Sequence, residues 1–84
     1  MNSPDSVCKA YANKDIKIRC RSKERWIEIE GSKKSLEFIG KLILAQAKYK
    51  NDCGFQISPY DGGNRFFAPH AKKGLYIHRL PCKK

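Results

Sequence analysis

The sequence predicts an α+β fold: a single, mostly antiparallel β-sheet of four to five strands with one helix packed on one face. Two patterns support this prediction. Residues 25–30 alternate between polar and apolar side chains, as in a strand with one buried face. After Gly31-Ser32 the apolar spacing becomes helical, in a stripe made of Leu36, Ile39, Gly40, Ile43 and Ala47. The order of elements is strand, strand, helix, strand, short strand, strand, which favours this layered arrangement.

The helix has recognisable ends. Ser32 is the predicted N-cap, because its hydroxyl can accept a hydrogen bond from an unpaired amide of the first turn. Lys48 and Lys50 lie at the other end, where the helix dipole favours cations. Phe38, Leu42 and Ala45 are expected on the shoulder of the apolar stripe. We expect the stripe to pack against the inward side chains of the sheet, namely Ile18, Ile27, Ile29, Phe55 and Ile77.

Residues 1–84 are expected to form one domain, with residues 1–10 as a flexible arm. Residues 16–20 alternate as a first strand, with Ile16, Ile18 and Cys20 facing inward. The short polar connection at 21–24 predicts an antiparallel hairpin with the second strand. The later strands are expected at 53–58, 65–68 and 75–80.

Charge is the strongest compositional signal. Eighteen Lys and Arg residues against eight Asp and Glu residues give a net charge of +10. Such a charge favours an acidic partner, whether a phosphate backbone, an anionic membrane or an acidic protein face. The alternative is a basic protein whose charge has no binding role. No apolar run is long enough to span a bilayer, and residues 1–6 do not resemble a signal peptide, so we expect a cytoplasmic protein without membrane association.

The four cysteines do not form a recognisable metal motif. None belongs to a C-x-x-C pair, and their spacing fits no standard zinc module. Two disulfides would suit a secreted chain, but without a signal peptide we expect buried thiols. No metal or cofactor site is predicted.

A single helix can cover only one face of the sheet, so the other face must be solvated or bound to a partner. Strand alternation places charged and aromatic side chains there, and an exposed Trp beside Tyr, Arg and His is typical of binding hot spots. The alternative is a solvated face on which Lys and Arg stems shield the aromatic rings. The predicted partner-binding residues are Lys17, Arg19, Trp26, Glu28, Tyr76 and His78.

Catalytic motifs are absent from the sequence, and we predict no enzyme. Glu28 and Glu30 share a strand face, but Lys17 and Arg19 are expected to neutralise them across the hairpin. Nucleic-acid binding is the alternative function, because basic residues and aromatic rings occur along the whole chain. Against it, the sequence lacks the aromatic and basic alternation of RNA-recognition modules, and its helix lacks a concentrated basic stripe.

Several segments between residues 25 and 82 together resemble a family of small bacterial proteins, the immunity proteins of polymorphic toxin systems. They are residues 27–32, the Leu-rich helix through 42–47, residues 52–59, Gly63-Asn64, and residues 74–80. The resemblance rests on sequence texture rather than on a catalytic motif.

The resemblance implies a cytoplasmic, non-enzymatic inhibitor that binds and blocks a toxin domain. Inhibitors of nucleic-acid-cleaving toxins are usually acidic, whereas this chain carries +10. The difference points to a toxin with an acidic surface. A homodimer through the uncovered sheet face is the second form of protein partner expected, and nucleic acid is the second choice of partner class.

Overall fold

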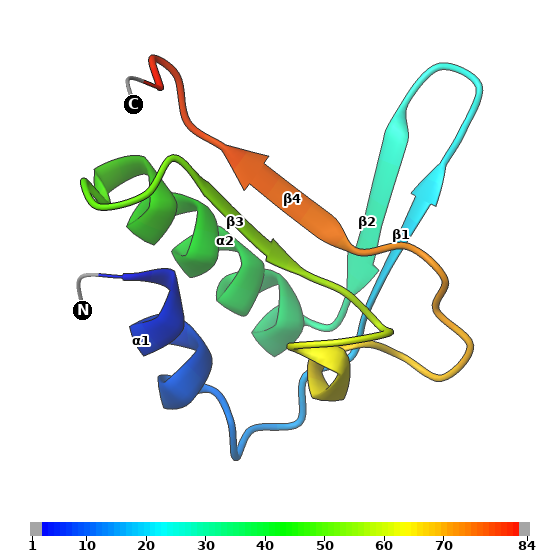
Figure 1. Ribbon diagram of the computed structural model, residues 1–84. Coiled ribbons are helices and arrows are strands. Elements are labelled where there is room, and N and C mark those ends of the chain that lie inside the picture. The colour runs from blue at the N-terminus through cyan, green and yellow to red at the C-terminus, as the bar shows by residue number, and fades with distance from the viewer. Residues whose placement is uncertain (1–2, 83–84) are drawn as a thin grey trace.

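The computed structural model describes residues 3–82, which form two helices, four strands and one short 3-10 helix (Figure 1). In chain order these are α1 (Pro4–Ala10), β1 (Ile18–Ser22), β2 (Ile27–Gly31), α2 (Lys33–Lys48), β3 (Gly54–Ile57), η1 (Asn64–Phe66) and β4 (Leu75–His78). The α+β class is confirmed.

The expected single sheet is wrong, because the strands form two separate two-stranded antiparallel sheets, β1–β2 and β3–β4. The short strand expected at 65–68 is instead η1, followed by one isolated parallel bridge between Phe67 and Ile18. Ala68 N also donates to Ile18 O at 2.9 Å. This irregular segment occupies the edge of β1 where a further strand would have to begin. The β1–β2 hairpin therefore diverges from β4 and α2 (Figure 1).

Helix α2 has the predicted ends but a different buried side. Ser32 Oγ accepts from Ser35 N at 3.1 Å, which confirms the N-cap. Leu36 and Ile43 are each 46% exposed, so the predicted stripe is wrong by about a third of a turn. The buried side of the helix consists of Ser35, Phe38, Ile39, Leu42, Ala45 and Gln46.

The core lies between α1, α2 and the inner sides of the two hairpins. The Phe38 ring packs against Tyr11 and Phe66, at centroid distances of 5.3 and 4.4 Å. The predicted inward residues of the first strand, Ile16, Ile18 and Cys20, are all buried, and Phe55 and Ile77 are partly buried against the core. The expected packing of β2 is wrong, because Ile27 is 75% exposed and Ile29 is 38% exposed. The hairpin turns away from the helix between its base and its tip (Figure 1).

The N-terminal segment is a helix and not the flexible arm expected for residues 1–10. Ser3 Oγ caps α1 by accepting from Ser6 N, and Pro4 occupies the start of the helix. Both are favourable helix-start signals that the sequence reading overlooked. Val7 is 1% exposed, which shows that α1 is part of the core. Residues 1 and 2 lie outside the described residues.

A disulfide joins Cys53 and Cys82, with the Cα atoms 5.6 Å apart, so the expectation of four thiols is wrong for this pair. Cys53 comes directly before β3 and Cys82 follows β4. The antiparallel pairing of Gly54 with His78 brings the start of β3 and the end of β4 together, and with them the two cysteines. Cys8 and Cys20 are free, as expected.

Candidate functional site

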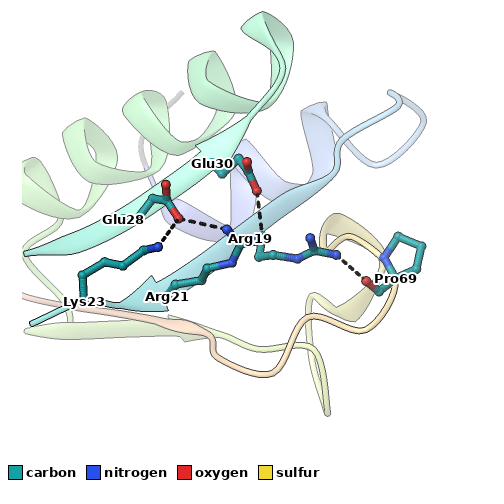
Figure 2. Close-up of polar contacts among 6 residues, drawn as sticks. All are labelled: Arg19, Arg21, Lys23, Glu28, Glu30 and Pro69. Atoms are coloured by element: carbon teal, nitrogen blue, oxygen red, sulfur yellow. Dashed lines mark hydrogen bonds and ion pairs between the residues drawn. The ribbon is translucent and has the colours of Figure 1, made fainter.

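The outer face of the β1–β2 hairpin carries a network of paired charges (Figure 2). Arg19 lies opposite Glu30 and Arg21 lies opposite Glu28, which confirms the predicted antiparallel hairpin. The connection is shorter than the expected 21–24, because Arg21 and Ser22 belong to β1. Arg21 binds both carboxylates, with nitrogen–oxygen distances of 3.2 Å to Glu28 and 3.6 Å to Glu30. Lys23 adds a contact of 4.0 Å to Glu28. Glu28 and Glu30 therefore form ion pairs with basic side chains of the hairpin and are not arranged as an acid–base pair.

Lys17 and Arg19 are not the cations that pair with these carboxylates, contrary to expectation. Arg19 Nη2 instead donates to Pro69 O at 2.7 Å and so reaches across to a different segment of the chain (Figure 2). Lys17 Nζ lies 3.6 Å from Asp15. Arg21 takes their place because it lies beside both carboxylates on the same strand face.

Trp26 lies at the tip of the hairpin. Its carbonyl accepts from Lys23 N at 2.8 Å, so the two residues close the loop, and its side chain is 67% exposed. The indole is therefore outside the core, as expected. Its place in the loop accounts for this, because Ile27, which strand alternation places inward, is exposed as well.

Tyr76 and His78 lie on β4, with their rings 5.8 Å apart. The Tyr76 ring lies over Gly54 of β3, where a Cβ atom would overlap the phenol oxygen. The predicted binding surface was the uncovered face of one sheet. That face does not exist, because β4 belongs to a different sheet from β1 and β2. The six predicted partner-binding residues divide into Tyr76 and His78 on β4, and Lys17, Arg19, Trp26 and Glu28 on or beside the first hairpin.

A set of aliphatic side chains that the chain leaves uncovered lies on β2 and α2. We call Ile27, Ile29, Leu36 and Ile43 the open apolar flank; they are 38–75% exposed. Ile29 lies opposite the buried Cys20 and is thus on the core-facing side of the hairpin. Leu36 and Ile43 occupy the side of α2 next to the buried Ile39. A Cβ atom at the neighbouring Gly40 would meet no atom within 4 Å, so this side of the helix is open.

A second feature is a cavity of about 510 Å³ between β1 and the segment 70–73, which we call the basic groove. The sequence analysis missed it, because residues 69–74 fall between the strands expected at 65–68 and 75–80. The adjacent pair Lys72-Lys73 was the available signal, but only the fold places it against β1. The lining residues are Arg19, Cys20, Arg21, Ser22, His70, Ala71, Lys72 and Lys73.

The free thiols are poor nucleophiles. Burial, with a smaller contribution from Asp5, raises the pKa of Cys8 to about 11. Burial also raises the pKa of Cys20.

Across residues 3–82, no group of three or more His, Cys, Asp and Glu side chains is placed to hold a metal ion. Within the same range, no helix has both the length and the apolar character needed to cross a membrane.

Comparison with family models, with curated proteins and with solved structures found no match to this chain.

Proposed function

We propose that this chain is a small, non-catalytic binding protein that neutralises a partner protein by covering part of its surface. The observation that carries the proposal is the open apolar flank. It consists of four large aliphatic side chains, contributed by two elements, that the described chain does not bury. Exposed apolar surface gains free energy when a partner removes it from water.

The charge of the chain supports an acidic partner. Helix α2, which supplies half of the flank, carries four lysines and one glutamate, and the whole chain carries +10. A partner with an apolar patch surrounded by carboxylates would complement both features. The resemblance to immunity proteins adds the biological role: neutralisation of a toxin domain with an acidic surface, in the cytoplasm.

The test is growth rescue followed by a binding measurement. The proteins encoded beside this chain are expressed singly in a bacterial host, and any that arrests growth is co-expressed with it. We expect rescue of growth and a stable complex of the two purified proteins. If no neighbouring product is toxic, or if the toxic product and this chain do not associate, the proposal is wrong.

A matched pair of variants on α2 tests the flank itself. Ile43→Gln removes an aliphatic side chain from the flank, whereas Leu44→Gln makes a similar change about 100° further round the helix. We expect Ile43→Gln to weaken the complex about tenfold or more and Leu44→Gln to change it by less than about threefold. Equal effects would show that the flank is not the interface.

Two other occupants of this surface give different results in the same preparation. A second copy of this chain would appear as a dimer by sedimentation without any partner, and Ile43→Gln would dissociate it. Nucleic acid would bind with an affinity that falls steeply between low and moderate salt, because each neutralised phosphate releases counterions. Either result in place of the toxin complex would contradict the proposal.

A further inference from the structure

The basic groove has an unusual wall, because one side of it is the open edge of a strand. In the β1–β2 ladder, Lys23 N donates to Trp26 O, so residues 23 and 26 form a hydrogen-bonded pair. Hydrogen-bonded and non-bonded pairs alternate along an antiparallel ladder. Arg21 and Arg19 therefore direct their backbone groups toward β2, while Cys20 and Ser22 direct theirs away from it.

The opposite edge of β1 is occupied only at its start. Ile18 O accepts from Ala68 N at 2.9 Å. Ile18 precedes Cys20 by two residues, so the alternation directs its backbone groups to the same edge. For Cys20 and Ser22, among residues 3–82, no backbone or side-chain partner continues the ladder on this side. Both residues line the groove, whose other wall is the segment that follows Ala68 on this edge of β1. From the ladder alternation we infer that their amide and carbonyl groups point to this side. An open strand edge of this kind is a template for pairing with another extended chain.

The other wall is held in place by a tight turn. Ala71 N donates to Ala68 O at 3.2 Å across Pro69 and His70, and His70 has a φ of 66°. Proline followed by a residue of positive φ is the arrangement of a type II turn. Ala71 is buried at 8% exposure, which anchors the segment and positions Lys72 and Lys73 at the groove.

The charge of the groove is largely uncompensated. Arg21 is paired with Glu28 and Glu30, but Arg19 is held by a carbonyl, which leaves its positive charge without a counterion. Within the described range no ion pair forms to Lys72 or Lys73, and no Asp or Glu lines the groove. The site combines a free strand edge with three cations that lack carboxylate partners.

We propose that the basic groove binds an extended acidic segment of the partner protein, which adds to the open edge of β1 as a further strand. Its backbone pairs with Cys20 and Ser22, and its carboxylates lie against Arg19, Lys72 and Lys73. The inference rests on the proposed function, since the segment belongs to the same partner. It adds a second contact, of defined chemistry, to the open apolar flank.

A peptide explains the site better than the other anions that a basic groove could attract. Phosphate groups can accept from the amides of Cys20 and Ser22, but they cannot donate to the carbonyl groups of the same residues. A peptide backbone supplies both partners. A second copy of this chain is disfavoured, because pairing β1 with itself would place the cationic groove residues of both copies together.

The experiment uses the purified full chain and a blocked, fluorescent peptide of alternating Glu and Val, about five residues long to match β1. We expect binding at low salt, with slower exchange of the Cys20 and Ser22 amide protons in the complex. An N-methylated peptide of the same sequence keeps the charge but loses the backbone donors. We expect it to bind about tenfold more weakly or worse.

Variants locate the site. Lys72→Glu/Lys73→Glu should weaken peptide binding about tenfold or more, whereas Lys33→Glu/Lys48→Glu makes the same charge change on α2 and should have less than about a threefold effect. Equal binding of the N-methylated peptide, equal effects of the two double variants, or no peptide binding would each overturn the inference. So would an oligonucleotide of equal charge that displaces the peptide. If the toxic partner binds the Lys72→Glu/Lys73→Glu variant normally, the groove inference fails while the proposed function stands.

Discussion

At the scale of single residues, one buried tyrosine connects the two helices. Tyr11, 5% exposed, donates its hydroxyl to Glu37 Oε2 at 2.7 Å. Lys34 and Lys41 lie 3.4 and 3.5 Å from the same carboxylate. The hydrogen bond from Tyr11, more than the nearby lysines, lowers the pKa of Glu37. Tyr11, and after it Glu37, raise the pKa of Lys41.

This contact predicts a pH-dependent effect of Tyr11→Phe. Because the pKa of Glu37 is lower in the folded state, its contribution to stability is present above the ordinary value of 4.5 and is lost as the pH falls through the folded value. We therefore expect Tyr11→Phe to be less stable than the parent at neutral pH, with the difference shrinking below about pH 4.5. Urea unfolding of both proteins over a pH series measures this. A difference that stays constant with pH would show that Glu37 is not the group involved.

The thiols give a second prediction at this scale. With a pKa of about 11, Cys8 is on the order of 0.1% thiolate at pH 8. We expect alkylation of the native protein to be slow at both free cysteines and to become fast in denaturant. The number of labelled thiols is the control: two without reductant and four after reduction. Rapid labelling of the native protein would contradict the raised pKa of Cys8 and the burial of Cys20.

At the scale of elements, α2 shows why helical periodicity was insufficient. Its apolar residues cover more than half of its circumference, so the stripe through Leu36 and Ile43 and the stripe through Phe38 and Leu42 both satisfy the helical spacing. Local sequence cannot choose between them. The choice is made by Tyr11 and Phe66, which both pack against Phe38.

The two sides of α2 should respond differently to truncation. Ile39→Ala removes a buried side chain, 4% exposed, and should lower the free energy of unfolding by about 2–5 kcal/mol. Leu36→Ala, at a position 46% exposed, should cost less than about 1 kcal/mol. Denaturant unfolding of the two variants and of the parent protein measures both changes in the free energy of unfolding. If Leu36→Ala were as costly as Ile39→Ala, the helix would pack on the flank that the structure leaves open.

At the scale of the whole molecule, the disulfide joins parts of the chain that are 29 residues apart in sequence. It closes the β3–β4 hairpin at the end where Arg79 N also donates to Cys53 O at 2.8 Å. Arg79 Nη2 in turn donates to Tyr49 O at 2.9 Å, just after α2. The last residues before Cys82 are thereby tied to both β3 and the end of α2.

Removing this cross-link should destabilise the whole fold. Cys82→Ser lets the unfolded chain explore more conformations, and we expect a loss of about 2–4 kcal/mol in the free energy of unfolding. Adding reductant to the parent protein should reproduce the loss, while reductant should not alter Cys82→Ser. Urea unfolding with and without reductant provides both measurements. Equal stability of the variant and the oxidised parent would show that the cross-link does not support the fold.

The sequence by itself determined those features that depend on residues close together along the chain. The Ser32 cap, the helix from Lys33 to Lys48 and the antiparallel β1–β2 hairpin each rest on contacts within one turn, helix or hairpin. Such patterns are legible because the period of a helix or a strand is set by backbone geometry.

Only the tertiary structure decided the rest, because it depends on contacts between distant segments. The pairing of Cys53 with Cys82 requires β3 and β4 to be antiparallel neighbours, and no spacing rule could select it from the other combinations. The division into two sheets follows from the bridge between Ile18 and Phe67, which occupies the edge of β1. That bridge also places Lys72 and Lys73 beside β1. The basic groove therefore exists only because the chain returns to β1 about fifty residues later and covers just the beginning of its edge.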